Sequence, residues 1–223
     1  VCVDPNDIPA VAIVDPELMY SMPKGLTAAT GMDALTHAIE SYITPGAWVM
    51  SDMFELKAIE MIAQNLKAAV DNGKDVAARE AMSQAQYIAG MGFSNVGLGI
   101  VHSMAHPLGA FYDTPHGVAN ALLLPYVMEY NAESPAAPKY IHIAKAMGVD
   151  TTGMSEAEGV KAAVEAVKAL SASINIPQKL HEINVKEEDI PALAVAAFND
   201  VCTGGNPRPT SVADIEALYR KAF

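Results

Sequence analysis

Apolar residues recur with helical spacing along most of this chain. From about residue 27 onward, apolar side chains repeat at positions i, i+3 and i+4 with polar residues between them. The pattern predicts helices at residues 30–43, 51–70, 76–90, 100–105, 117–131, 135–147, 155–171, about 187–199, and 211–222. The connections between them are short, as in a compact helical bundle. We therefore predict a mainly α fold.

Local signals mark the ends of several of these helices. Ser155 followed three residues later by Glu158 is a capping box, and Ser211 with Asp214 is a similar start. Pro191 falls in the first turn of its helix, where its missing N–H costs nothing. These signals agree with the periodicity.

The first 26 residues follow a different pattern. Residues 1–3 and 10–14 are rich in β-formers, and each run is followed by Asp-Pro, which ends a strand. Two strands do not form an independently stable sheet. We expect residues 1–26 to be trailing strands of a domain that lies upstream, and residues 27–223 to form the helical domain.

Composition excludes several classes of function. The 26 acidic and 14 basic residues give a net charge of −12, which argues against binding nucleic acid or an anionic membrane surface. Cys2 and Cys202 lie far apart and form no metal-binding pair, so neither a disulfide scaffold nor a thiolate zinc site is expected. With no signal peptide at the start, a reducing cytoplasm is the expected location.

Residues 81–112 contain no Asp, Glu, Lys or Arg. A membrane span would be predominantly apolar, whereas this stretch holds Gln84, Gln86, His102 and His106. It is typical of the interior of a soluble domain. An uncharged interior that carries histidines is the first place to look for chemistry.

Two helical segments offer imidazoles at a spacing of four. Asp33 and His37 project from one helix face, and so do His102 and His106. Pro107 disfavours helix at His106, so we expect the helix to end or kink there. For Asp33 and His37 alone, the simpler interpretation is a carboxylate near the helix N-terminus and a core histidine.

A loop rich in Gly and Pro then brings His116 to the start of the next helix. Three histidines within fifteen residues of this interior favour a metal site, since a divalent cation satisfies buried imidazoles. Imidazoles with one carboxylate suit Fe²⁺ or Zn²⁺ and leave a position open for substrate. The spacing alone leaves open which histidines bind.

The other candidate motifs are weaker. The glycines at 90–92 and 97–99 match neither a dinucleotide loop nor a Walker loop and suit close packing between helices. No nucleophile elbow surrounds Ser103, which argues against a serine hydrolase. His142 and His181 lie in polar contexts, where we expect them to be solvated.

Three stretches carry a resemblance to a known family. GMDALTHAIESYI, MGFSNVGLGIVHSMAHPLGAFYDTPHGVANALLLPYVM and the late DVCTGGNPR resemble iron-containing (group III) alcohol dehydrogenases. The resemblance covers essentially the whole chain. It implies the C-terminal helical domain of the dehydroquinate synthase-like fold, preceded by a short β remnant of an upstream Rossmann-like cofactor domain.

The resemblance also implies a ligand set and one catalytic residue. It places Fe²⁺, with Zn²⁺ as the other possible ion, on Asp33, His37, His102 and His116. His106 matches a catalytic position beside the nicotinamide rather than a ligand.

Around this centre the resemblance places Phe93 and Cys202 near the substrate, and Leu18 beside the cofactor ribose. The implied reaction is hydride transfer between NAD(H) and a small primary alcohol or aldehyde, such as 1,2-propanediol or lactaldehyde. The pyrophosphate loop that binds NAD(H) belongs to the upstream domain, so we expect this metal-binding half to be inactive alone. The parent is expected to be a homo-oligomer, such as a dimer.

Two alternatives stay open at this stage. A relative of glycerol dehydrogenase or dehydroquinate synthase would have the same architecture with a different ligand set. A metal-stabilised helical module without turnover, or a metal hydrolase, would have a different function. Reduction of an aldehyde by NADH separates these alternatives from the first interpretation.

Overall fold

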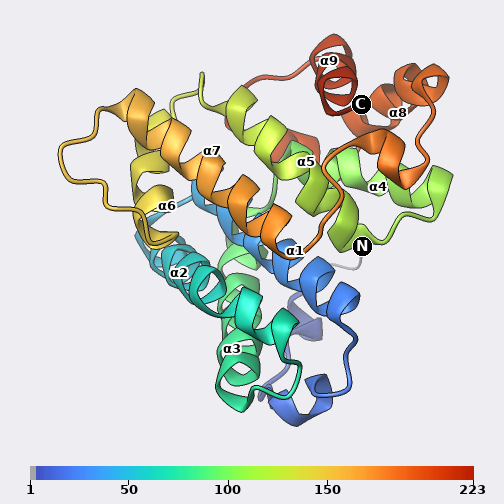
Figure 1. Cartoon of the computed structure of the whole chain (residues 1–223). Helices are drawn as coiled ribbons and strands as arrows, with labels where there is room; N and C mark the ends of the chain where they lie inside the picture. The colour runs from blue at the N-terminus through green and yellow to red at the C-terminus, as the bar shows by residue number, and fades with distance from the viewer. Residues whose placement is uncertain (1–3) are drawn as a thin grey trace.

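The computed structural model describes residues 4–223, and helices dominate this part of the chain (Figure 1). The α-helices are α1 Lys24–Ile43, α2 Val49–Asp71, α3 Val76–Val96, α4 Ile100–Tyr112, α5 His116–Asn131, α6 Tyr140–Ala146, α7 Glu156–Ser173, α8 Ile190–Phe198 and α9 Val212–Ala222. Short 3-10 turns η1 to η6 occupy Pro5–Asp7, Pro16–Met19, Ala137–Lys139, Leu180–Ile183, Glu187–Asp189 and Val201–Gly205. The mainly α prediction is confirmed.

The helix starts follow from side-chain caps. Both expected capping boxes are present, with Ser155 and Glu158 at α7 and Ser211 and Asp214 at α9. Pro191 is in the first turn of α8, as the sequence predicts. These bonds satisfy N–H groups that a helix leaves free at its first turn.

The expectation that a helix ends near His106 is wrong. Helix α4 continues through Pro107 to Tyr112. Met104, Ala105 and Leu108 are fully buried around the proline, so packing holds this segment helical against its local preference. The longer helix keeps His102 and His106 on one rigid element, one turn apart.

The expected strand at residues 10–14 is also wrong. No strand occurs within residues 4–223, and this segment is irregular. Val11 and Ile13 are 76% and 89% exposed, so no neighbouring strand covers them or pairs with their backbone. The first expected strand, residues 1–3, lies outside the described part of the chain.

Helix α1 occupies the centre of the molecule. It packs against α2, α3 and α5, while α4 packs against α5 and α8 (Figure 1). Most of α1 is buried, including Met32, Leu35, Ala38 and Ile39. The site described below forms where α1, α4 and α5 meet.

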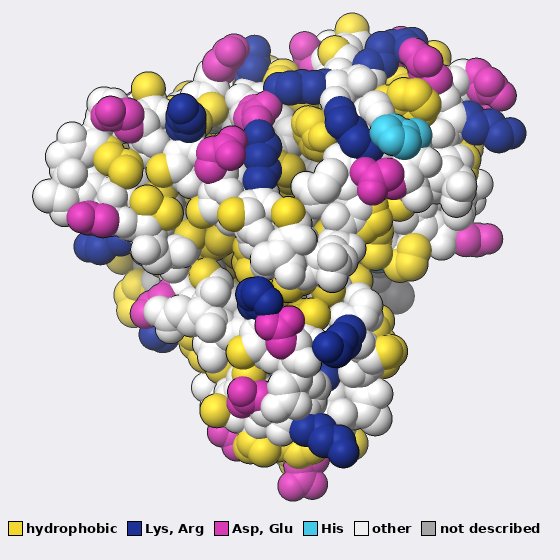
Figure 2. Space-filling view, viewed as in Figure 1, with side chains coloured by type: hydrophobic (Ala, Val, Ile, Leu, Met, Phe, Trp, Pro, Cys, Tyr) yellow, Lys and Arg dark blue, Asp and Glu magenta, His cyan; other side chains and the backbone are white. Residues whose placement is uncertain are grey.

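Acidic and basic side chains are interspersed over the face shown in Figure 2, among exposed apolar residues. No helix in the described part of the chain is both long and apolar enough to cross a membrane.

Candidate metal site

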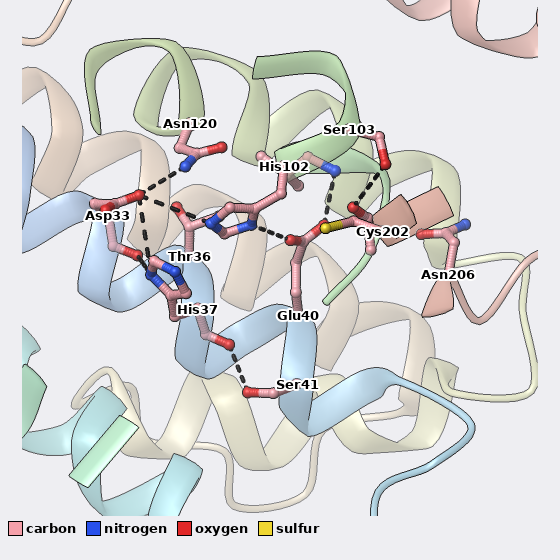
Figure 3. Close-up of polar contacts among 12 residues, drawn as sticks. Asp33, Thr36, His37, Glu40, Ser41, His102, Ser103, Asn120, Cys202 and Asn206 are labelled. Carbon is pink, nitrogen blue, oxygen red and sulfur yellow. Dashed lines mark hydrogen bonds and ion pairs between the residues drawn. The ribbon is translucent and has the colours of Figure 1, made fainter. Parts of the chain in front are cut away.

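Helix α1 contributes three functional side chains from one face. Asp33, His37 and Glu40 follow one another at spacings of four and three, so they line the same side of the helix (Figure 3). His37 Nδ1 donates a hydrogen bond of 2.8 Å to the backbone carbonyl of Asp33. Because a carbonyl only accepts, the proton of neutral His37 is on Nδ1 and its Nε2 carries a free lone pair.

Helix α4 brings His102 against this face. Its Nδ1 is 2.5 Å from Glu40 Oε2, and its Nε2 is 3.9 Å from Asp33 Oδ1. Both His102 and Glu40 are only 2% exposed. His102 Nε2 is buried and has no hydrogen-bond partner. A buried polar atom without a partner is costly, and this one faces a carboxylate.

Helix α5 begins with His116 beside the same carboxylate. His116 Nε2 is 3.5 Å from Asp33 Oδ1 and accepts a 3.0 Å hydrogen bond from Asn120 Nδ2, which also donates to Asp33 Oδ1 at 2.6 Å. Gly117 allows this approach, because a Cβ there would lie 2.3 Å from the carbonyl oxygen of Ala29. The start of α5 thereby fits closely against α1.

These atoms fit a divalent cation. Asp33, His37 and His102 each offer a ligand atom within 4.8 Å of the other two; His116 is outside that set of three but approaches Asp33. Burial lowers the pKa of His37 to about 4, and neighbouring His102 adds to the effect. Burial also lowers the pKa of His116. Neutral imidazoles and one carboxylate are a donor set for Fe²⁺ or Zn²⁺.

His106 has a carboxylate partner of its own. Its Nδ1 is 2.7 Å from Asp200 Oδ2, while Asp200 Oδ1 accepts the backbone N–H of Cys202 at 2.9 Å. Burial of Asp200 opposes ionisation, but the bonds from Cys202 and His106 hold the pKa of this carboxyl below its usual value. His106 therefore donates from Nδ1 and keeps Nε2 free. Its ring stacks on that of His116 at 5.4 Å.

The three expected pocket residues lie in different surroundings. Phe93 on α3 packs its ring 4.4 Å from that of His37. Cys202 is half-buried beside Asp200, and burial, with Asp200, raises the pKa of its thiol to about 12. Leu18 on η2 is 81% exposed and does not line the cavity at this site.

A cavity of about 450 Å³ reaches this site between α1 and α3. Asp33, His37 and Phe93 line one part of it. Methionines and small residues line much of the remainder, among them Met19, Met22, Ala34, Met82, Ala89 and Gly90. The candidate ligands therefore face a largely apolar space rather than the filled core.

Known proteins match both the sequence and the overall fold of this chain. The Fe-containing alcohol dehydrogenase family, C-terminal, matches residues 27–223. The chain belongs to this family. Lactaldehyde reductase of Escherichia coli (strain K12) is 60% identical over all 223 residues, which cover 58% of that protein. The resemblance noted from the sequence is confirmed.

Further relatives agree with this membership. The NAD-dependent methanol dehydrogenase of Bacillus methanolicus is 45% identical over 99% of this chain and 58% of its own length. The crystal structure of 1,3-propanediol oxidoreductase superposes with a TM-score of 0.95 and 47% identity, covering 97% of this chain and 56% of that one. The chain thus spans somewhat more than half the length of these relatives.

Sequence reasoning missed three polar side chains at this site. Glu40 and Asn120 had a usable signal, because they lie three residues after His37 and four after His116 on the same helix faces. Asp200 had none, since nothing in the sequence connects it with His106. The exposed positions of His142 and His181, away from the cluster, agree with expectation.

Proposed function

We propose that this chain is the metal-binding domain of an NAD-dependent alcohol dehydrogenase that interconverts a small primary alcohol and its aldehyde. Propane-1,2-diol and lactaldehyde are the substrate pair that the lactaldehyde reductase relative suggests. The activity is that of a longer protein, in which residues 27–223 form the metal-binding domain and a separate domain binds most of NAD(H). We expect the chain alone to be inactive.

One observation carries this proposal. His102 Nε2 is buried without a partner and faces Asp33, in a cluster with His37 and His116. A histidine packed only for stability would use both ring nitrogens or expose one to water. A cation held by Asp33 and the three imidazoles satisfies this nitrogen.

Bound there, Fe²⁺ or Zn²⁺ supplies Lewis acidity toward the oxygen of the alcohol or aldehyde. The protein residues do the rest of the positioning. Asp33 and His37 would hold the ion from α1, His102 from α4 and His116 from α5, so binding would depend on the relative positions of all three helices. The neutral state of His37 favours binding, since its lone pair is not occupied by a proton at neutral pH.

His106 takes the proton of the alcohol. Asp200 fixes its Nδ1–H, which leaves Nε2 as the acceptor on a ring that is 37% exposed and exchanges protons with solvent. In the reverse direction the same Nε2 returns a proton to the oxygen of the aldehyde. Cys202 stays a neutral thiol, since its pKa is about 12.

Phe93 and the apolar cavity set the substrate class. The phenyl ring covers His37 and excludes water from that side of the ligand cluster. The cavity walls suit a short aliphatic chain. NAD use is inferred from relatives, among them the NAD-dependent methanol dehydrogenase and a sulfoacetaldehyde reductase solved in complex with NAD⁺. The exposed Leu18 is free to contact a nucleotide held by another domain.

The test uses the longer protein that carries this chain. We expect elemental analysis to find about one Fe or Zn per chain. A panel of short alcohols with NAD⁺ should give NADH, and treatment with a chelator should abolish that activity until metal is restored. Undiminished turnover after complete metal removal would contradict the proposal.

A further inference from the structure

We infer that Glu40 is the positioning residue that presets His102 for metal binding, and that Gly99 leaves the space that the Glu40 carboxylate occupies. This inference rests on the proposed metal site. The juxtaposition is direct: Glu40 on α1 reaches the first turn of α4 and holds both its backbone and its histidine (Figure 3).

Each oxygen of Glu40 has a different task. Oε1 accepts the backbone N–H of Val101 at 2.7 Å, and Oε2 accepts from His102 Nδ1 at 2.5 Å. The N-cap residue of α4 is Gly99, which has no side chain to satisfy the free N–H groups of the first turn. Glu40 on α1 therefore caps the N-terminus of α4 and fixes the position of α4 relative to α1.

Gly99 makes this approach sterically possible. A Cβ at Gly99 would lie 2.9 Å from Glu40 Oε1 and 3.2 Å from Asn206 Oδ1. The Glu40 carboxylate therefore explains Gly99, the second glycine of the pair at 97–99. The sequence alone indicated only close packing between helices at this pair. The carboxylate enters at the N-terminus of α4, where the helix dipole also favours negative charge.

The consequence for metal binding is the tautomer of His102. The Glu40 carboxylate accepts a hydrogen bond from Nδ1–H, which keeps the proton of the neutral ring on Nδ1. Nε2, the nitrogen that faces Asp33, then carries no proton. Metal-binding histidines commonly donate their second N–H to such a carboxylate, and loss of that partner weakens metal affinity by about 10–100-fold. Glu40 acts on the ion through His102.

The main variant is Glu40→Gln in this chain, with Zn²⁺ as the probe. Glutamine keeps the shape, but its amide has one accepting oxygen for the two N–H groups of Val101 and His102. Glu55→Gln is the matched control, because Glu55 is equally buried on α2 and has no hydrogen-bond partner. Gly99→Ala is a second variant, which leaves Glu40 in place but crowds its carboxylate.

Two measurements are made on each variant. Competition with a chromophoric chelator gives the Zn²⁺ dissociation constant, and ¹H–¹⁵N correlations of the imidazole rings give the tautomer of His102 in the metal-free chain. We expect Glu40→Gln to weaken Zn²⁺ binding by about 10–100-fold and to move the His102 proton toward Nε2. Gly99→Ala should change both in the same direction by less, and Glu55→Gln should change neither.

The outcomes separate this inference from the proposed function. If the unmodified chain binds Zn²⁺ and Glu40→Gln binds it equally well with an unchanged tautomer, the inference is wrong and the metal site stands. If the unmodified chain binds no Zn²⁺, both fail. If Glu40→Gln does not fold, Gly99→Ala decides: an unchanged Zn²⁺ affinity and tautomer would overturn the inference.

Discussion

Helix α4 carries two histidines one turn apart, each held at Nδ1 by a carboxylate, and the two pairs differ mainly in burial. His102 and Glu40 are both 2% exposed, whereas His106 and Asp200 are 37% and 17% exposed. His102 Nε2 faces Asp33 with no partner and no access to water. His106 instead stacks on His116 near the surface.

The difference indicates how one local pattern supports two kinds of chemistry. In both pairs a carboxylate holds the proton on Nδ1 and frees Nε2. Where water is excluded, the free nitrogen needs a cation to satisfy it, as at His102. Where water reaches the ring, as at His106, we propose that the same nitrogen exchanges protons instead. On α4, we propose that burial, rather than the pairing itself, separates the expected ligand His102 from the acid–base group His106; His116, the expected ligand on α5, is itself 43% exposed.

Removing the carboxylate of the exposed pair should have the largest effect on turnover. In the longer protein, Asp200→Asn places an amide beside His106 and removes the partner that fixes its tautomer. We expect kcat to fall by about 10²–10⁴-fold while the metal content stays unchanged. Asp200 also accepts the backbone N–H of Cys202 at the start of η6. Asp214→Asn, in the capping box of α9, is the control for the loss of such a capping carboxylate away from the site. If the Asp200→Asn protein is instead purified without metal, the His106–Asp200 pair takes part in metal binding and the distinction between the two pairs is wrong.

Acidification should have a smaller effect, because it acts only through competition between protons and the metal for the imidazoles. A histidine with an ordinary pKa of about 6.5 begins to lose metal just below neutrality. Burial lowers the pKa of His37 to about 4 and also lowers that of His116, so protons compete with the metal only at lower pH. Three histidines with pKa values of about 6.5 would lower the Zn²⁺ affinity by roughly 1,000-fold between about pH 7.5 and 5.5. We expect the affinity of this chain to fall by less than about 100-fold over the same range. Titrations with a competing chelator across this range measure it, and a steeper loss would contradict the assignment of buried ligands.

Glu55 sharpens the comparison, since it is a buried carboxyl without an imidazole partner, and its effect is on stability rather than on metal binding or turnover. Burial raises the pKa of Glu55 to about 8. The folded chain therefore keeps this proton at pH values where the unfolded chain has released it. This contribution to stability is complete below about pH 4.5 and is lost progressively as the pH rises through about 8.

Glu55→Gln removes this dependence of the unfolding free energy on pH, because the glutamine side chain stays neutral at every pH. We expect the variant to gain about 1–3 kcal/mol in unfolding free energy relative to the unmodified chain between about pH 5 and pH 8. Urea unfolding of both proteins at the two pH values measures the difference. An identical pH dependence in the two proteins would show that Glu55 is ionised in the folded chain.

Much of the helical architecture was predictable because apolar periodicity reports which face of each segment is buried. The spacing of Asp33 and His37 correctly placed them on one face, and the capping boxes were local enough to find by inspection. Pro107 misled the prediction, because packing around it outweighed its local preference. Residues 10–14 misled it as well, since β propensity forms no strand without a partner.

The arrangement of the site depended on contacts between distant parts of the chain. Spacing makes His102 and His106 equivalent, because both lie on one face of α4. They differ through Glu40 and Asp200, which lie 62 and 94 residues away in the sequence. No single-segment pattern encodes which carboxylate meets which histidine, and the ligand assignment itself remains a prediction.

The most direct test of the account is the metal content of His106→Ala and His102→Ala, purified in parallel with the unmodified protein. We expect His106→Ala to retain about one Fe or Zn per chain and His102→Ala to retain none. His116→Ala accompanies them, because it removes an expected ligand that is 43% exposed and leaves the Glu40 contact intact; it should also lose the ion. If His106→Ala is metal-free while His102→Ala and His116→Ala keep their metal, the roles assigned to the two pairs on α4 are reversed.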